Sequence, residues 1–335
     1  MTEPGDTAGR IRGCLLGGAV GDALGSGVEF DSIERIRERL GPAGVTGYVV
    51  AYGRRGAITD DTQMTLFTAE GLLLADDGAE VRTVVDRAYA RWLAIQGERS
   101  PRWPDDDGGG WLARVPGLDG RRSPGRTCLS ALRADRAGSV AAPINASKGC
   151  GGVMRIAPVG LLGRGHGGDP FGLGCDLAAL THDHPSGYLA AGAMALIVAR
   201  LLEGESLRAA LDAAERRLAG CPGHEETLAA LRAARALAAS DVAPGPEAVA
   251  TLGLGWVAEE ALAIGVYGAL VARDFVHGVL VAVNHSGDCD STAAITGSIL
   301  GTMHGVDVVP EAWLAELEVR DEIERLAAAW IARFA

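Results

Sequence analysis

The chain has 335 residues, of which 48% are hydrophobic and only 5% are aromatic, and its formal net charge is -12. The hydrophobic content excludes a mostly disordered protein, and the acidic balance argues against a broad basic surface for nucleic acid or an anionic membrane. Heavy use of Ala, Leu and Gly favours closely packed helices over sheets, so we expect an all-α protein.

Neither the cysteines nor the N-terminus indicates export. The six cysteines form no C-x-x-C pair, so the sequence signals neither a zinc site nor a disulfide framework. Residues 1–6 lack the pattern of a signal peptide, and no segment approaches the roughly 18 uninterrupted apolar residues of a membrane span. We therefore expect a soluble, cytoplasmic monomer without a membrane partner, in which residues 1–8 form a flexible tail.

The first third of the chain contains several helical patterns and one strand-like segment. Residues 11–24 combine apolar and small residues, which predicts a buried helix that another helix can approach closely. Residues 31–40 are charged and periodic, and residues 44–52 have strand character. A core helix is expected after Thr59 and another over residues 81–95.

Proline and glycine punctuate the rest of the chain. Residues 98–126 contain several prolines and a run of acidic and glycine residues, which predicts a long loop. Further helical patterns lie at residues 172–182, 187–203, 205–219, 223–239, 256–271, 275–283, 292–303 and 310–334. We expect one domain, in which the first and last thirds of the chain pack together.

Two acidic clusters each precede an apolar helical pattern. The first is Thr59-Asp60-Asp61-Thr62 and the second is Asp288-Cys289-Asp290-Ser291. Threonine and first-turn acids are ordinary helix caps, so capping explains either cluster taken alone. Carboxylates and hydroxyls are also the ligands that Mg²⁺, Mn²⁺ and Ca²⁺ prefer. If the two helix starts converge in space, they form a metal site.

Other motifs carry less meaning by themselves. The glycine-rich segment from Ser147 to Arg155 is either a tight turn or a backbone cradle for phosphate. Residues 163–168 match G-x-G-x-x-G but lack the strand–helix context of a dinucleotide-binding fold. His182 and His184 have no further residues at zinc-ligand spacing. Glu29, a lone acid, would ordinarily be a surface residue.

Taken together, these segments resemble the ADP-ribosylglycohydrolase family. They occur in the family's order and span nearly the whole chain. The matching segments are Gly17 to Gly25 with Glu29, Thr59 to Thr62, Gly151 to Pro158, Thr181-His182, and Gly287 to Ser291.

The resemblance implies an all-α fold, a single multi-helix domain over residues 1–335 with two divalent cations, Mg²⁺ or Mn²⁺, in a central cleft. It implies as metal ligands Thr59, Asp60, Asp61, Asp288, Asp290 and Ser291. It implies that the ADP-ribose is bound by Ser147, Lys148, Gly149, Gly151, Gly152 and His182. Glu29 would lie over the distal ribose, and either Glu29 or Asp61 would act as the catalytic base.

Two residues depart from the family's pattern. Lys148 stands where some members have an aromatic residue that stacks on adenine, and Cys150 replaces a common asparagine. Stacking on adenine is therefore not expected at position 148. Lys148 would instead offer a positive charge to phosphate, which the acidic background of the chain requires.

The implied activity is hydrolysis of the glycosidic bond between ADP-ribose and an acceptor, through an oxocarbenium-like transition state. The favoured substrate is an ADP-ribosylated protein, with arginine as the acceptor. The alternatives are an ADP-ribosyl-serine, O-acetyl-ADP-ribose, nucleic-acid or small-molecule conjugate, or a binding protein of the same fold that has lost turnover.

Overall fold

Helices provide the regular structure of this protein. The computed structural model describes residues 7–75, 80–104, 109–163 and 168–335, so the predicted tail lies largely outside the described residues. The α-helices are α1 (Thr7–Gly25), α2 (Ile33–Leu40), α3 (Asp60–Leu74), α4 (Val81–Ile95), α5 (Arg126–Leu132), α6 (Ala157–Gly160), α8 (Pro170–Ala178), α9 (Pro185–Leu202), α10 (Leu207–Leu218), α11 (Glu225–Ala238), α12 (Pro246–Val249), α13 (Ala258–Val271), α14 (Phe275–Val283), α15 (Cys289–His304), α16 (Glu311–Glu316) and α17 (Arg320–Phe334). The all-α prediction is confirmed.

The strand predicted over residues 44–52 is wrong, and the described ranges contain only isolated bridges such as Ala51 with Arg54. A side chain satisfies the backbone here. Asn284 accepts from the Val45 N–H at 2.7 Å and donates to the Val45 carbonyl at 2.9 Å. A strand needs a partner strand, and the segment has none within the described residues. Val45 instead contacts Asn284 at the end of α14.

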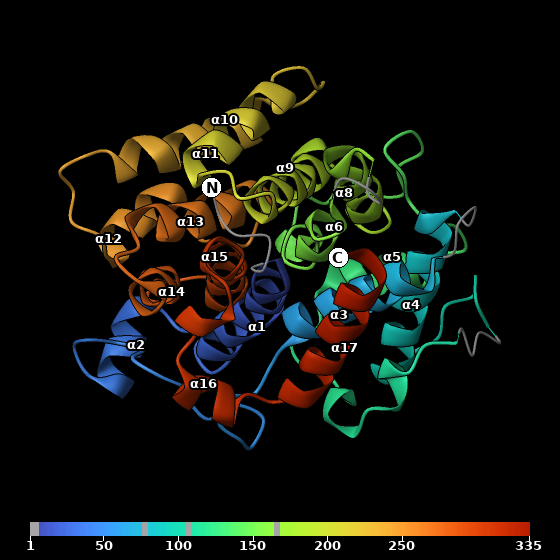
Figure 1. Ribbon diagram of the computed structural model, residues 1–335, viewed down its shortest axis with the longest axis horizontal. Helices are drawn as coiled ribbons and strands as arrows, with labels where there is room; N and C mark the ends of the chain where they lie inside the picture. Colours follow the sequence, from blue (N-terminus) through green and yellow to red (C-terminus); the bar gives the residue numbers. More distant parts are fainter. Residues whose placement is uncertain (1–6, 76–79, 105–108, 164–167) are drawn as a thin grey trace.

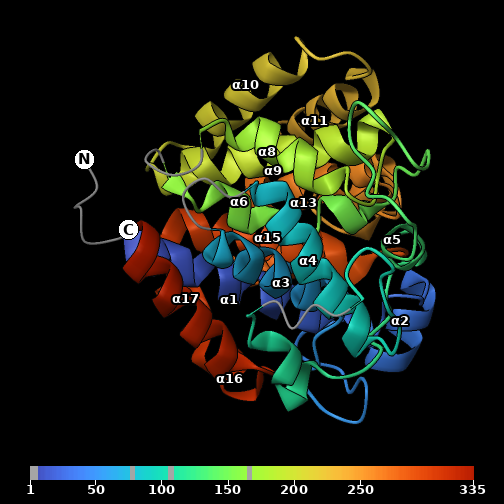
Figure 2. The ribbon, with the colours of Figure 1, turned by 90° about the vertical axis from the view of Figure 1, so that its right-hand side faces the viewer.

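The centre of the molecule is the contact between α1 and α15, which run side by side in both views (Figures 1 and 2). Glycines permit this contact. A Cβ on Gly301 would lie 1.9 Å from the Gly13 carbonyl oxygen, and a Cβ on Gly297 would lie 2.0 Å from that of Gly17. Neither helix tolerates a side chain at these positions. The first and last thirds of the chain therefore pack together, as predicted.

The remaining helices enclose this central pair. In Figure 1, α13 and α14 lie on one side of α15, and α9, α10 and α11 form the upper part of the molecule. Helix α9 is long and apolar enough to cross a membrane, but 72% of its apolar window is buried inside the protein. Such burial is typical of a core helix in a soluble protein, so α9 is weak support for a membrane span.

Between α4 and α5, the described residues 96–104 and 109–125 are mostly loop, with two short 3₁₀ turns at Leu112–Arg114 and Pro116–Leu118. Glu70 anchors this loop to α3. One Glu70 oxygen accepts from the N–H groups of Trp111 and Leu112 at 2.6 and 2.9 Å, and the other pairs with Arg91 of α4 at 2.9 Å. This buried network fixes the loop across α3 and α4.

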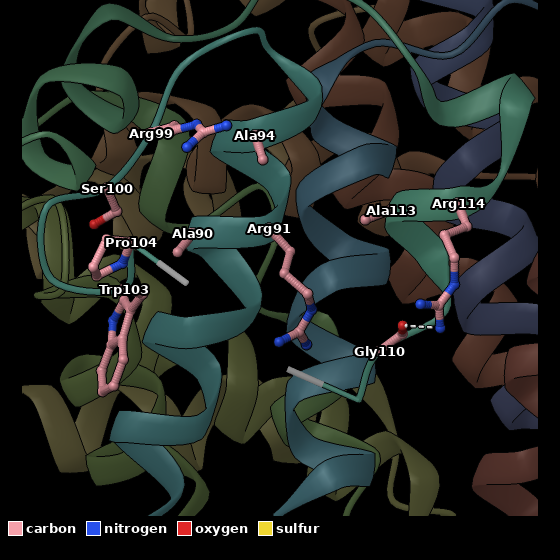
Figure 3. A pocket seen from close by; sticks show the side chains of 10 residues that line it. All are labelled: Ala90, Arg91, Ala94, Arg99, Ser100, Trp103, Pro104, Gly110, Ala113 and Arg114. Carbon is pink, nitrogen blue, oxygen red and sulfur yellow. Dashed lines mark hydrogen bonds between the residues drawn. The ribbon is translucent and has the colours of Figure 1, made fainter. Parts of the chain in front are cut away.

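A hollow on the outer side of α4 lies beside this anchor (Figure 3). Arg91, Arg99 and Arg114 line it, with Ser100 and Trp103 on the loop that follows the helix. None of the site residues expected from the sequence lies here. The hollow is therefore separate from the cleft described below.

Candidate functional site

The N-termini of α3 and α15 meet beside the C-terminal end of α1. Thr59 caps α3 and accepts from the Asp61 N–H at 3.2 Å, so Asp60 and Asp61 lie in the first turn. Helix α15 begins at Cys289, three residues earlier than the sequence pattern indicated, and its first turn contains Asp290. A Cβ on Gly25 would lie 2.3 Å from the Asp290 backbone nitrogen, so α1 abuts the start of α15.

These helix starts line one cleft of about 350 Å³. The cleft brings together many of the residues expected from the sequence, namely Glu29, Asp60, Asp61, Gly149, Gly151, His182, Asp288 and Ser291. Asp290 lies behind its wall, where Glu29, Asp288 and Asp290 each offer a carboxylate oxygen within 4.8 Å of the others. Thr59 is also behind the wall, with its hydroxyl 3.5 Å from Asp61. The two acidic clusters therefore converge.

Asp22, which the sequence pattern did not single out, holds the start of α3 in place. It is fully buried, and its carboxylate accepts from the N–H and hydroxyl groups of both Thr59 and Thr62. The distances from the two N–H groups are 3.0 to 3.1 Å. The sequence signals for this role were that Asp22 is the one charged residue among residues 13–25 and that it lies in the Gly17 to Gly25 segment that resembles the family.

The electrostatics of the cleft favour a bound cation. Burial is the largest cause that raises the pKa of Asp60, Asp61, Asp288 and Asp290, and mutual repulsion among carboxylates adds to it for Asp60, Asp61 and Asp288. Burial, followed by repulsion from Asp290, raises the pKa of Glu29 to about 10. The buried oxygens Oδ1 of Asp61 and Oε2 of Glu29 have no hydrogen-bond partner among the described residues.

The glycine-rich segment forms a second wall of the cleft. It contains a short 3₁₀ turn at Cys150–Gly152, and the N–H of Cys150 donates to the Trp256 carbonyl at 3.2 Å. A Cβ on Gly151 would lie 2.8 Å from both His182 and Cys128, so this turn needs glycine there. The Cys150 thiol donates to Asp288 at 2.8 Å and links the wall to the acidic cluster.

His182 closes the inner end of this wall. Its Nδ1 lies 2.8 Å from the Thr181 hydroxyl, and its other edge faces Gly149 and Gly151. Burial, with a contribution from the charge of Arg155, lowers the pKa of His182 to about 3. The ring is therefore neutral at physiological pH and offers the cleft a hydrogen bond without a charge.

The structure does not bring all of the predicted ligand-binding residues into the cleft. Lys148 points its ammonium group to Glu226 at 2.9 Å and to Glu259 at 2.6 Å, and it does not line the cavity. Two carboxylates thus neutralise the charge that the sequence offered to phosphate. Ser147 and Gly152 also lie outside the lining, although the Ser147 hydroxyl contacts the Thr127 hydroxyl at 3.0 Å.

Two aromatic residues that the sequence pattern did not indicate stand at the rim. Phe30 and Trp256 stack with their ring centroids 5.7 Å apart and their planes 14° apart. Phe30 is 75% exposed, and both rings line the cleft. Because Phe30 follows Glu29, the stack holds the segment that carries this carboxylate. Sequence spacing gave no signal, since the two residues lie far apart in the chain.

Comparison with known proteins agrees with this geometry. A family model described as ADP-ribosylglycohydrolase matches residues 3–335. The ADP-ribosyl-(dinitrogen reductase) glycohydrolase of Rhodospirillum rubrum is 27% identical over 327 residues, covering 97% of this chain and 95% of that protein. The ADP-ribosylarginine hydrolase Tri1 of Pseudomonas putida (strain GB-1) is 25% identical over 345 residues, covering 97% of this chain and 78% of that protein.

A vertebrate protein and a solved structure are similar as well. The ADP-ribosylhydrolase ARH3 of Gallus gallus is 26% identical over 358 residues, covering 95% of this chain and 91% of that protein. A solved structure described as an ADP-ribosylglycohydrolase-related protein complex superposes with a TM-score of 0.71 at 26% identity, covering 98% of this chain and 99% of that one.

Proposed function

Because the chain belongs to the ADP-ribosylglycohydrolase family, we propose that it is a divalent-cation-dependent enzyme that releases ADP-ribose from modified protein side chains, with arginine as the favoured acceptor. Its hydrolase activity follows from the family and from the names of its relatives. The cations and the acceptor are the proposal. The observation that supports it is the convergence of the two acidic clusters and Glu29 at one cleft.

The proposed cation site rests on the charge that the fold has buried. Carboxylates taken out of water are costly unless a positive charge compensates them. Asp61 and Glu29 each keep a buried oxygen without a hydrogen-bond partner in the described part of the chain, and such oxygens can coordinate a cation. The proposed ligands are Thr59, Asp60, Asp61, Asp288, Asp290 and Ser291, an all-oxygen set that fits Mg²⁺ or Mn²⁺.

Cations held by these residues would supply positive charge and would lower the pKa of a bound water. The chain's own groups do the remaining work. Asp61 and Glu29 are the two candidates for the proton acceptor, since each lines the cleft and keeps a buried oxygen without a hydrogen-bond partner among the described residues. Neutral His182 and the backbone of Gly149 and Gly151 form the wall proposed to bind the adenosine and phosphate end.

The names of two relatives support a modified protein as the substrate, and one of them supports arginine as the acceptor. The Pseudomonas putida relative is named an ADP-ribosylarginine hydrolase, and the Rhodospirillum rubrum relative is named for a modified protein substrate. A protein that had kept only binding would tolerate loss of the acidic residues. Here the complete set is present, which supports turnover over binding alone.

An activity panel tests the proposal. The purified protein, stripped with EDTA and then supplied with Mg²⁺ or Mn²⁺, would be incubated with ADP-ribosyl-arginine, ADP-ribosyl-serine and O-acetyl-ADP-ribose, and released ADP-ribose would be measured by chromatography. We expect cation-dependent release, fastest from ADP-ribosyl-arginine. Release that is equally fast in EDTA would contradict the cation site, and release from another conjugate alone would reassign the acceptor.

Substitution of Asp290 links the activity to the site. Asp290→Ala should abolish release and remove the stabilisation that Mn²⁺ gives in thermal unfolding, because it deletes a ligand shared by the converging clusters. Asp212→Ala is the control. This α10 carboxylate pairs with Arg235 at a distance of 2.7 Å and does not line the cleft. If Asp290→Ala kept full activity, the cation site would be wrong.

A further inference from the structure

The cleft is strongly unbalanced in charge. Its lining includes the carboxylates Glu29, Asp60, Asp61 and Asp288, whereas Arg126 is the one cationic side chain among the described residues that line it. His182 does not offset this, because burial lowers its pKa to about 3. Among the described residues, Arg126 is therefore the one cation of the cleft lining that a diphosphate would meet.

The other basic side chains near the cleft are already engaged. Lys148 pairs with Glu226 and Glu259, and buried Arg155 donates to the Thr181 hydroxyl at 2.7 Å. Arg126 differs from both. It is exposed, and within the described part of the chain it makes no ion pair or side-chain hydrogen bond. Its guanidinium is available to a ligand.

The neighbours of Arg126 fix its place in the cleft. On one side, the Gly125 N–H donates to an Asp60 oxygen at 3.0 Å, which ties the chain to the acidic cluster. On the other side, the Thr127 hydroxyl lies 3.0 Å from that of Ser147, which ties it to the glycine-rich wall. Arg126 thus stands between the carboxylates and the wall proposed for the phosphate end.

We infer that Arg126 binds the diphosphate of ADP-ribose and discriminates phosphate-bearing ligands from uncharged ones. The inference rests on the proposed function and names a residue that the sequence pattern did not indicate. A guanidinium donates two parallel hydrogen bonds to phosphate oxygens, which a lysine ammonium cannot reproduce. Arg126 takes the part that the sequence had assigned to Lys148.

The chain supplies matched controls next to Arg126. An adjoining polar pocket is lined by Arg126 together with Arg121 and Arg133. Both of these arginines pair with Glu98, at 3.3 and 3.0 Å, and neither lines the cleft. Their replacement removes the same charge from the same region but leaves the cleft itself unchanged.

The test compares ligand binding by calorimetry in the presence of Mg²⁺. Arg126→Ala should bind ADP-ribose about tenfold more weakly than the wild type, the loss of one charged hydrogen-bonding group at an exposed site, and should bind adenosine unchanged. The affinity of Arg126→Lys for ADP-ribose should lie between those of Arg126→Ala and the wild type, and Arg133→Ala should bind both ligands like the wild type. The difference in ADP-ribose affinity between Arg126→Ala and the wild type should become smaller as NaCl is added.

Two results would overturn the inference. One is an Arg126→Ala variant that binds ADP-ribose as tightly as Arg133→Ala does; the other is an equal loss for ADP-ribose and adenosine, which indicates a damaged cleft. Turnover of ADP-ribosyl-arginine by the wild type in the same preparation separates failure of this inference from failure of the proposed function. If the wild type turns over the substrate and Arg126→Ala binds ADP-ribose as tightly as the wild type does, the inference alone is wrong. If the wild type neither binds ADP-ribose nor releases it, the proposed function is wrong as well.

Discussion

Asp22 offers the sharpest test of how the fold builds the cleft. Its carboxylate is fully buried at the end of α1 and accepts from the backbone N–H groups of Thr59 and Thr62, and from both hydroxyls. Burial, with repulsion from Asp290, raises the pKa of Asp22 to about 7. We predict that Asp22→Ala destabilises the protein and weakens cation binding without removing any proposed ligand.

The magnitude follows from the hydrogen bonds that are lost. Asp22→Ala leaves the N–H groups of Thr59 and Thr62 buried without an acceptor, at a cost of roughly 1–3 kcal/mol for each group. Removal of one carboxylate from beside Asp290 relieves repulsion and offsets part of this cost. We expect the free energy of unfolding in EDTA to fall by about 2–4 kcal/mol, within the range for a broken buried network. Cation affinity should fall about tenfold, because Thr59 is no longer held.

Urea unfolding in EDTA and Mn²⁺ titration of the folded protein give the two quantities. Asp86→Ala is the matched control, because Asp86 is a buried carboxylate on α4 that pairs with Arg102 at 2.7 Å, away from the cleft. The control should lose stability but keep its Mn²⁺ affinity. A loss below about 0.5 kcal/mol for Asp22→Ala, with Mn²⁺ affinity unchanged, would refute the assigned role of Asp22, since even one orphaned group costs more.

Three further predictions address the role of Glu29, the contact between α1 and α15, and the loss of stability in acid. Glu29→Gln should slow turnover more than it weakens ADP-ribose binding, and equal losses in kinetics and calorimetry would mean that Glu29 only binds. Gly301→Ala should lower the free energy of unfolding, measured in urea, by at least about 2 kcal/mol, because its Cβ would lie 1.9 Å from the Gly13 carbonyl oxygen. An unchanged midpoint of urea unfolding would contradict that contact. Burial lowers the pKa of His285 to about 4, so the unfolded state binds more protons than the folded state below pH ~6.5. The free energy of unfolding of the wild type should therefore fall by about 1 kcal/mol per pH unit, relative to that of His285→Gln, as the pH falls from ~6.5 towards 4. Parallel pH profiles of the two proteins would contradict this.

The helices were predictable because their signals are local. Thr59 before two acids marked the start of α3, and the pattern over residues 81–95 gave α4 with both ends correct. The segment at residues 44–52 shows the limit of such signals. Its β-branched residues favour a strand only where another strand supplies hydrogen bonds, and here the side chain of Asn284, from a remote part of the chain, supplies them.

The residues of the candidate site also differ in whether a local sequence signal or only the fold reveals them. Asp60 and Asp288 were predictable because each occurs in a short motif at a helix start. Asp22 acts through Thr59 and Thr62, which only the fold brings near. The position of Arg126 is likewise set by the fold, through neighbours that contact Asp60 and Ser147. Lys148 shows the converse case, since its sequence position suggested a free charge that two distant glutamates occupy. A motif therefore indicates which side chains are capable of chemistry, while the charges and hydrogen bonds that reach them through the fold decide which remain available. By that criterion Arg126 is available to phosphate and Lys148 is not.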